Sequence, residues 1–153
     1  MYKVFNFSLI LFFLSVSSLH SQLVKPNEII KPLQVIEIQL NGLKNNDSSK
    51  DNGIEQTWEF AHPNNRIFTG PLDRFKEMIK GESYKMLLNH IDHEIKEVYA
   101  EDAIAVYEVI IVDSSKRYFK FKWQVEKYVG EGPLKNCWLT TVVSQPMAII
   151  DTA

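Results

Sequence analysis

The chain has 153 residues, a formal net charge of −2 and 24% charged residues, which is typical of a single globular domain. It contains no block of Lys and Arg, so the sequence disfavours nucleic acid or another polyanion as a partner. Cys137 is the only cysteine, which excludes a scaffold held together by disulfides within the chain. None of these properties identifies a chemical activity.

The first residues have the layout of a secretory signal peptide. Lys3 precedes an apolar run from Val4 to Val16, and small polar residues follow as far as Ser21. The run is shorter than the roughly 20 apolar residues that span a bilayer, so we expect cleavage rather than a stable membrane anchor. The expected location is therefore secreted or periplasmic. The expected division of the chain is a signal peptide at 1–21, an N-terminal extension at 22–31, one α+β domain at 32–148 and a C-terminal tail at 149–153.

Three helices are expected in the first half of the mature chain. Apolar residues recur at intervals of three and four after Pro32, which predicts a helix over Pro32–Lys44. A short helix is expected over Ile54–Ala61, ended by the segment 62–65 because Pro63 disfavours helical geometry in the residue before it. A third helix is expected over Pro71–Lys80, with Gly81 as its end.

After Gly81 the apolar period changes from that of a helix to that of a strand. Strands are predicted over His90–Tyr99, Ile104–Val112, Arg117–Val125 and Asn136–Val143. Helices followed by a meander of strands predict an α+β fold, with a curved four-stranded antiparallel sheet and the N-terminal helices packed on one face.

The expected hairpins define which side chains share the helix-covered face. We pair Tyr99 with Ile104 and Asp113 with Lys116, as tight turns require. These pairings place the following residues on the covered face: Ile91, His93, Ile95, Val106, Glu108, Ile110, Phe119, Phe121 and Trp123.

His93 and Glu108 are the two ionisable members of that face, on diagonal positions about 7–8 Å apart. Burial would raise the pKa of the Glu108 carboxyl and favour a neutral acid or a pair with His93. They are the candidate acid and base; in the alternative reading Glu108 lies at the sheet rim or points outward. The expected lining of the pocket is Trp58, His93, Ile95, Glu108, Ile110, Phe121 and Trp123.

Other candidates are weaker. His90 and His93 have a spacing seen in metal sites, but three residues along a strand place them on opposite faces. His90, Asp92 and Glu94 share the outer face, where a solvated polar surface is the simpler interpretation. We predict no metal and no cofactor. Cys137 is expected to be a buried, inert thiol. Arg66 either closes over a polar ligand or pairs with a surface carboxylate.

One polar segment matches the acceptor pattern for N-glycosylation, at Asn46-Asp47-Ser48. This match is common by chance and would matter only in a eukaryotic host.

Two stretches, WEFAHPNNRIFTGPLDRF (Trp58–Phe75) and YKMLLNHIDHEI (Tyr84–Ile95), resemble a family of unknown function, the domain of unknown function 4864 family. The resemblance would extend from about Leu33 to Met147. That family is similar to the nuclear-transport-factor-2-like superfamily, a cystatin-like group in which helices and a strongly curved sheet form a cone with an internal pocket. The resemblance implies this architecture but no activity, because the superfamily contains both enzymes and non-catalytic binding subunits.

The favoured function is a non-catalytic binding module for a small apolar ligand or a protein partner. The alternative is an enzyme that uses Glu108 and His93 as acid and base. A homodimer through the open sheet face is compatible with the first function, because Tyr107, Val109 and Ile111, with Tyr118, would form an exposed stripe there.

Overall fold

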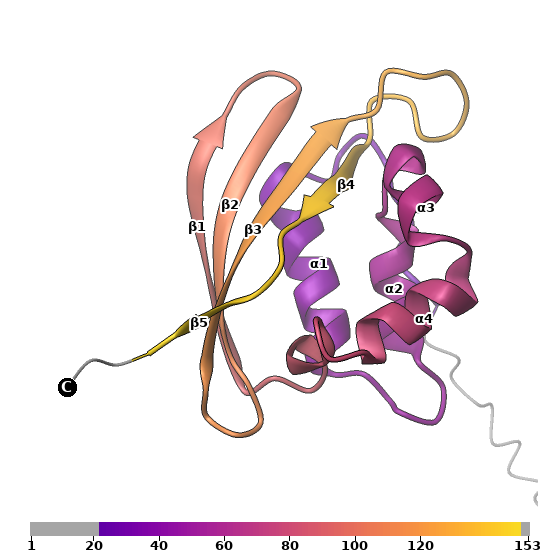
Figure 1. The fold of residues 1–153 in the computed structure, drawn as a ribbon. Coiled ribbons are helices and arrows are strands. Elements are labelled where there is room, and N and C mark those ends of the chain that lie inside the picture. The colour runs from indigo at the N-terminus through magenta and orange to yellow at the C-terminus, as the bar shows by residue number, and fades with distance from the viewer. Residues whose placement is uncertain (1–21, 151–153) are drawn as a thin grey trace, which may run out of the picture.

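The computed structural model describes residues 22–150. They form an α+β domain in which all the helices lie on one face of a curved, open antiparallel sheet (Figure 1). No helix in this range is long and apolar enough to cross a membrane. The α-helices are α1 (Pro32–Lys44), α2 (Asn52–Glu59), α3 (Pro63–Thr69) and α4 (Leu72–Lys80), and a short 3₁₀-helix, η1, covers Lys85–Leu87. The strands are β1 (Asp92–Ala100), β2 (Ile104–Val112), β3 (Tyr118–Lys127), β4 (Trp138–Val143) and β5 (Met147–Ile149).

Helix α1 has the predicted bounds. Pro32 occupies its first position, where a missing N–H leaves no hydrogen bond unmade. Its buried stripe faces the sheet and consists of Val35, Ile36, Gln39, Leu40 and Leu43. Asn89, which has a φ of +53°, ends the helix by donating its backbone N–H to the carbonyl of Leu43 at 2.9 Å. The connection between η1 and β1 is therefore joined to the end of α1.

Helices α1 and α2 touch through two glycines. A Cβ atom added at Gly53 would lie 1.9 Å from the carbonyl oxygen of Gly42, so only glycine fits at this crossing. The side chain of Asn46 fixes the start of α2, because its Oδ1 accepts the backbone N–H groups of Gly53 (3.0 Å) and Ile54 (3.2 Å). Asn46 is thus a buried cap, 7% exposed, and its side chain is not presented for glycosylation.

The helix expected over Ile54–Ala61 is α2 and ends two residues earlier, at Glu59, before the segment 62–65 that was expected to end it. That segment instead begins a helix that was not predicted. Pro63 is the first residue of α3, and His62 caps it, since its Nδ1 accepts the backbone N–H of Asn64 at 3.0 Å. No residue of α3 is fully buried, so the helix has no apolar stripe by which its period could have been recognised.

The sheet has the strand order β1-β2-β3-β4, which confirms the four predicted strands. The short β5 was not predicted; it pairs with the first residues of β3 and continues the line of β4 (Figure 1). The free edge of β4 is partly covered by the chain after α2, where Ala61 and Thr140 form a parallel bridge.

The predicted register was wrong by one residue. The turn between β2 and β3 closes by a hydrogen bond between Asp113 and Arg117 and contains Lys116 at φ +61°, so it is one residue longer than the tight turn we assumed. Val109 therefore lies opposite Phe121. On the other side, Ile95 pairs with Val109, and a bulge between Glu97 and Tyr99 shifts the register again.

This shift exchanges the two faces of β2, because successive side chains of a strand point in opposite directions. Tyr107, Val109 and Ile111 lie under the helices and are at most 3% exposed. The stripe on which the predicted homodimer was based is therefore part of the core. Of its residues, only Tyr118 is exposed, at 47%.

Candidate functional site

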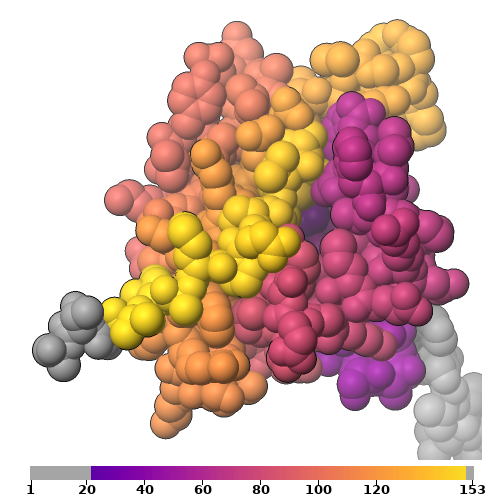
Figure 2. Space-filling view, in the orientation of Figure 1, coloured from indigo at the N-terminus to yellow at the C-terminus, as the bar shows by residue number. Residues whose placement is uncertain are grey.

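The helices and the sheet enclose a cavity of about 80 Å³ between α1, α4 and η1 on one side and β3 and β4 on the other. Figure 2 shows the hollow that leads to it, between β4 in yellow and α3 and α4 in magenta. The indigo atoms at the floor of this hollow belong to the N-terminal part of the domain. The cavity is lined by Gln39, Leu43, Thr57, Ala61, Asn65, Thr69, Phe75, Met78, Ile79, Tyr84, Leu87, Trp123, Thr140 and Val143.

One wall of the cavity is a buried hydrogen-bond network centred on Gln39. Its Oε1 accepts the Thr140 hydroxyl at 2.6 Å and the indole N–H of Trp123 at 3.1 Å. Its Nε2 donates to the carbonyl of Thr57 at 3.0 Å. The network joins α1, α2, β3 and β4, and it satisfies the buried polar groups that would otherwise be costly.

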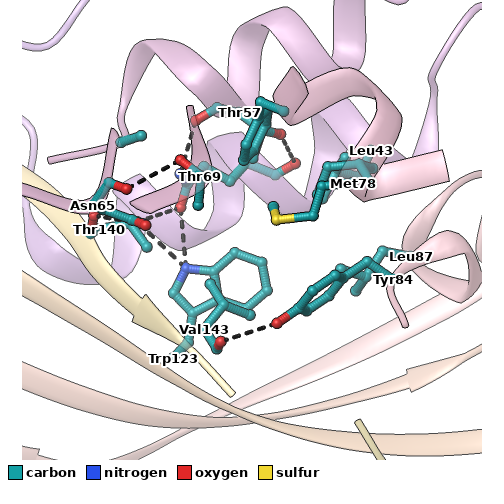
Figure 3. Close-up of a pocket in the computed structure, with 14 residues that line it drawn as sticks. Leu43, Thr57, Asn65, Thr69, Met78, Tyr84, Leu87, Trp123, Thr140 and Val143 are labelled. Carbon is teal, nitrogen blue, oxygen red and sulfur yellow. Dashed lines mark hydrogen bonds between the residues drawn. The ribbon is translucent and has the colours of Figure 1, made fainter. Parts of the chain in front are cut away.

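The mouth of the cavity carries further neutral polar groups. Asn65 donates its Nδ2 to the Thr140 carbonyl at 3.3 Å, and the Thr69 hydroxyl donates to the Asn65 carbonyl at 3.1 Å. The Tyr84 hydroxyl lies 3.4 Å from the carbonyl of Val143, and burial raises the pKa of this phenol. In Figure 3 the side chains of Tyr84, Trp123 and Met78 converge on the cavity.

The remaining wall is apolar and is formed by Leu43, Phe75, Met78, Ile79 and Leu87. Among the described residues that line the cavity, none carries a charge at neutral pH. A charged ligand would be desolvated there without a counter-ion, which is strongly unfavourable. The chemistry of the cavity therefore favours an uncharged, mostly apolar molecule.

Of the residues predicted to line a pocket, only Trp123 lines this cavity. Glu108 and Phe121 instead border a second hollow, to which β1, β2, β3 and β5 contribute. Phe121 is fully buried in the core beside Trp123, and Ile95 is half-buried against the same core. Trp58 packs on Phe75, with ring centroids 5.0 Å apart, outside the lining.

Glu108 and Ile110 lie on the outer face of the sheet. Glu108 pairs with Lys122 in the β2–β3 register, and its carboxylate lies 3.3 Å from the ammonium group of Lys120. His93 lies on the inner face, opposite Ile111. The structure does not bring Glu108 and His93 together, because the register differs by one residue from the expected one.

His90 and His93 lie side by side rather than on opposite faces. β1 begins only at Asp92, so His90 precedes the strand and its ring folds back, with its Nε2 2.8 Å from Nδ1 of His93. The Nδ1 of His90 lies 2.7 Å from the carbonyl of Leu87. Because a carbonyl can only accept, His90 carries its proton on Nδ1, and its Nε2 accepts from His93. Burial is the main cause that lowers the pKa of both imidazoles.

The weaker candidates have structural surroundings. Arg66 donates to the carbonyls of Trp58 (2.7 Å) and Glu59 (3.2 Å) at the end of α2, and its guanidinium lies over the Trp58 ring. It therefore caps a helix rather than closing over the cavity. Cys137 is buried, as expected. Within residues 22–150, no three His, Cys, Asp or Glu side chains are grouped so that they could hold a metal ion.

A scan against models of known protein families, a search of curated proteins and a search of solved structures found no match to this chain. The resemblance described above stays a prediction. We therefore base the function on the residues of the cavity.

Proposed function

We propose that the protein is a non-catalytic binding module whose cavity holds the apolar end of a small, uncharged ligand. The observation that carries this proposal is the partly enclosed cavity with an apolar wall, a neutral hydrogen-bonding wall and no charged lining residue. Concave, mostly apolar sites with a few placed polar groups are the usual form of small-molecule sites.

The size of the cavity limits the part of the ligand that enters. A cavity of about 150 Å³ holds benzene, so 80 Å³ suits about three non-hydrogen atoms, such as the end of a branched alkyl chain. The rest of the ligand would extend through the mouth, past Asn65, Thr69 and Tyr84. Hydroxyl or amide groups of a ligand can hydrogen-bond there.

The alternative function, acid–base catalysis by Glu108 and His93, gains no support from the geometry. The two side chains lie on opposite faces of the sheet, and Glu108 is paired with Lys120. An enzyme of this fold would need other groups at the cavity, and none of the lining residues titrates near neutral pH. His90 is not a lining residue and is connected to the cavity only through its hydrogen bond with the Leu87 carbonyl.

We further propose that the chain is exported and cleaved near residue 21, which lies outside the described residues. Mass spectrometry of the protein from its native host should find a mature N-terminus between Leu19 and Leu23. An intact Met1 in a membrane fraction would contradict export with cleavage.

The binding proposal is tested with three molecules of matched shape: isobutanol, isobutyrate and isobutylammonium. In NMR titrations we expect isobutanol to shift resonances of Leu43, Met78 and Leu87, with at least about tenfold higher affinity than either ion, since the cavity cannot compensate a charge. Equal binding of all three molecules, or no binding of isobutanol, would contradict the proposal.

Neighbouring residues of β4 provide a matched pair of variants. Val143 lines the cavity, whereas Val142 lies on the outer face and is 45% exposed. Val143→Phe should fill the cavity and abolish isobutanol binding, and Val142→Phe should leave it unchanged. Circular dichroism of both variants would show that each retains the fold.

A further inference from the structure

The cavity has one wall that is held by a titratable pair. Leu87 of η1 lines the cavity, and its carbonyl is the acceptor for Nδ1 of the buried His90. His90 in turn accepts from His93 at the start of β1. A continuous chain of hydrogen bonds therefore runs from the cavity wall to the edge of the sheet.

The protonation states of this chain follow from its geometry. In the neutral pair, both rings carry their proton on Nδ1, and the only free lone pair is that of His93 Nε2. One proton can bind there without breaking a bond. A second proton would have to bind His90 Nε2, which faces His93 Nδ1 at 2.8 Å, so two N–H groups would then point at each other.

The charged groups around the pair do not favour two protons. Lys44 at the end of α1 opposes protonation of both rings, whereas Asp92 of β1 favours it, and Glu37 of α1 favours protonation of His93. Burial outweighs these contributions and lowers both pKa values. Opening of the η1–β1 connection would expose the rings and restore their ordinary pKa of about 6.5.

We propose that the His90–His93 pair is a proton-operated latch on the η1 wall of the cavity, closed at neutral pH and opened by acid. The consequence for the ligand rests on the binding function proposed above. When the latch opens, Leu87 and Tyr84 lose their fixed positions, and the cavity loses affinity for its occupant. Because the native pKa values of both rings are lowered, the open state binds more protons than the closed one, so a falling pH favours the open state.

The test uses the whole chain and two readouts between about pH 7.5 and pH 5, the range in which imidazole titrates. The first is the affinity for isobutanol, which has no charge anywhere in this range. The second is the hydrogen-exchange protection of the amides of Leu87, Leu88 and Asn89, corrected for intrinsic exchange and compared with β2. Both should fall at least about tenfold at the acidic end, and nitrogen-15 shifts should show both rings protonated on Nδ1 at neutral pH.

Two variants separate the latch from a general effect of acid. His93→Gln keeps a donor for His90 Nε2 but removes one titrating ring, so its pH dependence should be clearly weaker. His62→Asn removes a different histidine while keeping a residue that can cap α3, and it should behave as the wild type does.

A wild type whose η1 protection does not change with pH would overturn the latch, as would a His93→Gln protein with an unchanged profile. If η1 protection follows pH but isobutanol never binds, the latch is supported and the binding function fails. If His93→Gln does not fold, the wild-type protection and nitrogen-15 shifts still decide the question.

Discussion

Gln39 shows how a single polar residue organises the interior of this protein. It is 1% exposed, yet it lies on a helix face that otherwise carries aliphatic residues. Its amide accepts from Trp123 and Thr140 and donates to the Thr57 carbonyl, so one side chain joins two helices to two strands. This role of Gln39 could not be predicted from the sequence, because its partners are up to 101 residues away in the chain and come together only on folding.

Replacing Gln39 with Leu should lower the free energy of unfolding by about 1–3 kcal/mol. The leucine has a similar size, but the buried Thr140 hydroxyl would lose its acceptor at 2.6 Å, and the Trp123 N–H would keep only its longer contact with Thr140 Oγ1 at 3.4 Å. Urea unfolding measures the change. Gln145→Leu is the control: it removes only a solvent-exposed contact of 3.4 Å to the Tyr84 hydroxyl, so its effect should be clearly smaller. Equal stability of the two variants would contradict the role of the network.

Replacing Trp123 with Ala should cost about 3–5 kcal/mol, since the side chain is 1% exposed and forms part of the core and of the cavity wall. Thermal unfolding of the variant checks this value. A change within experimental error would mean that the side chain is not packed in the core.

At the scale of elements, the strands were predictable and their register was not. The alternation of Phe119, Phe121 and Trp123 with lysines and polar residues identifies β3 and its buried face directly from the sequence. The length of the turn after β2 could not be predicted in the same way, because Lys116 adopts a left-handed conformation that is uncommon for lysine. One extra residue in that turn moved Glu108 from the inner face to the outer one.

Asp113 holds this turn, and the turn should therefore be sensitive to pH. Burial opposes ionisation of its carboxyl, but hydrogen bonds from the Arg117 and Ser115 backbone and from the Arg117 guanidinium outweigh burial and lower the pKa. Because its native pKa is lowered, ionised Asp113 stabilises the protein above about pH 4, and this stabilisation is lost as the pH falls further.

The variant Asp113→Asn should be about 1–2 kcal/mol less stable than the wild type near pH 7, and this difference should shrink at about pH 3. Urea unfolding at both pH values provides the comparison. A difference that is the same at both values would show that the charge of Asp113 contributes nothing.

The contact between α1 and α2 provides a second prediction at this scale. Gly53→Ala should destabilise the protein by about 3 kcal/mol or more, because its Cβ would lie 1.9 Å from the Gly42 carbonyl. Gly42→Ala should cost clearly less, since its Cβ would be 3.1 Å from the Gly53 carbonyl, and alanine also favours the helix. Equal stability of the two variants, measured by urea unfolding, would contradict this close crossing.

At the scale of the whole molecule, the α+β architecture could be predicted because the apolar period changes once, from helix to strand, after Gly81. The cavity could not. Its lining comes from four α-helices, η1 and two strands, and its position depends on α3, which has no buried residue of its own. The expected strand register placed Glu108 and Ile110 in the predicted pocket, but neither residue lines the cavity.

The central claim is that the protein holds a small, uncharged, apolar group in the cavity between its helices and its sheet. A crystal structure determined under xenon pressure tests it most directly, because xenon is uncharged, binds in apolar cavities and scatters strongly. We predict a xenon peak between Leu43, Met78, Leu87 and Trp123, absent from the Val143→Phe variant. A cavity region filled by side chains, with no xenon in the wild type, would contradict the claim.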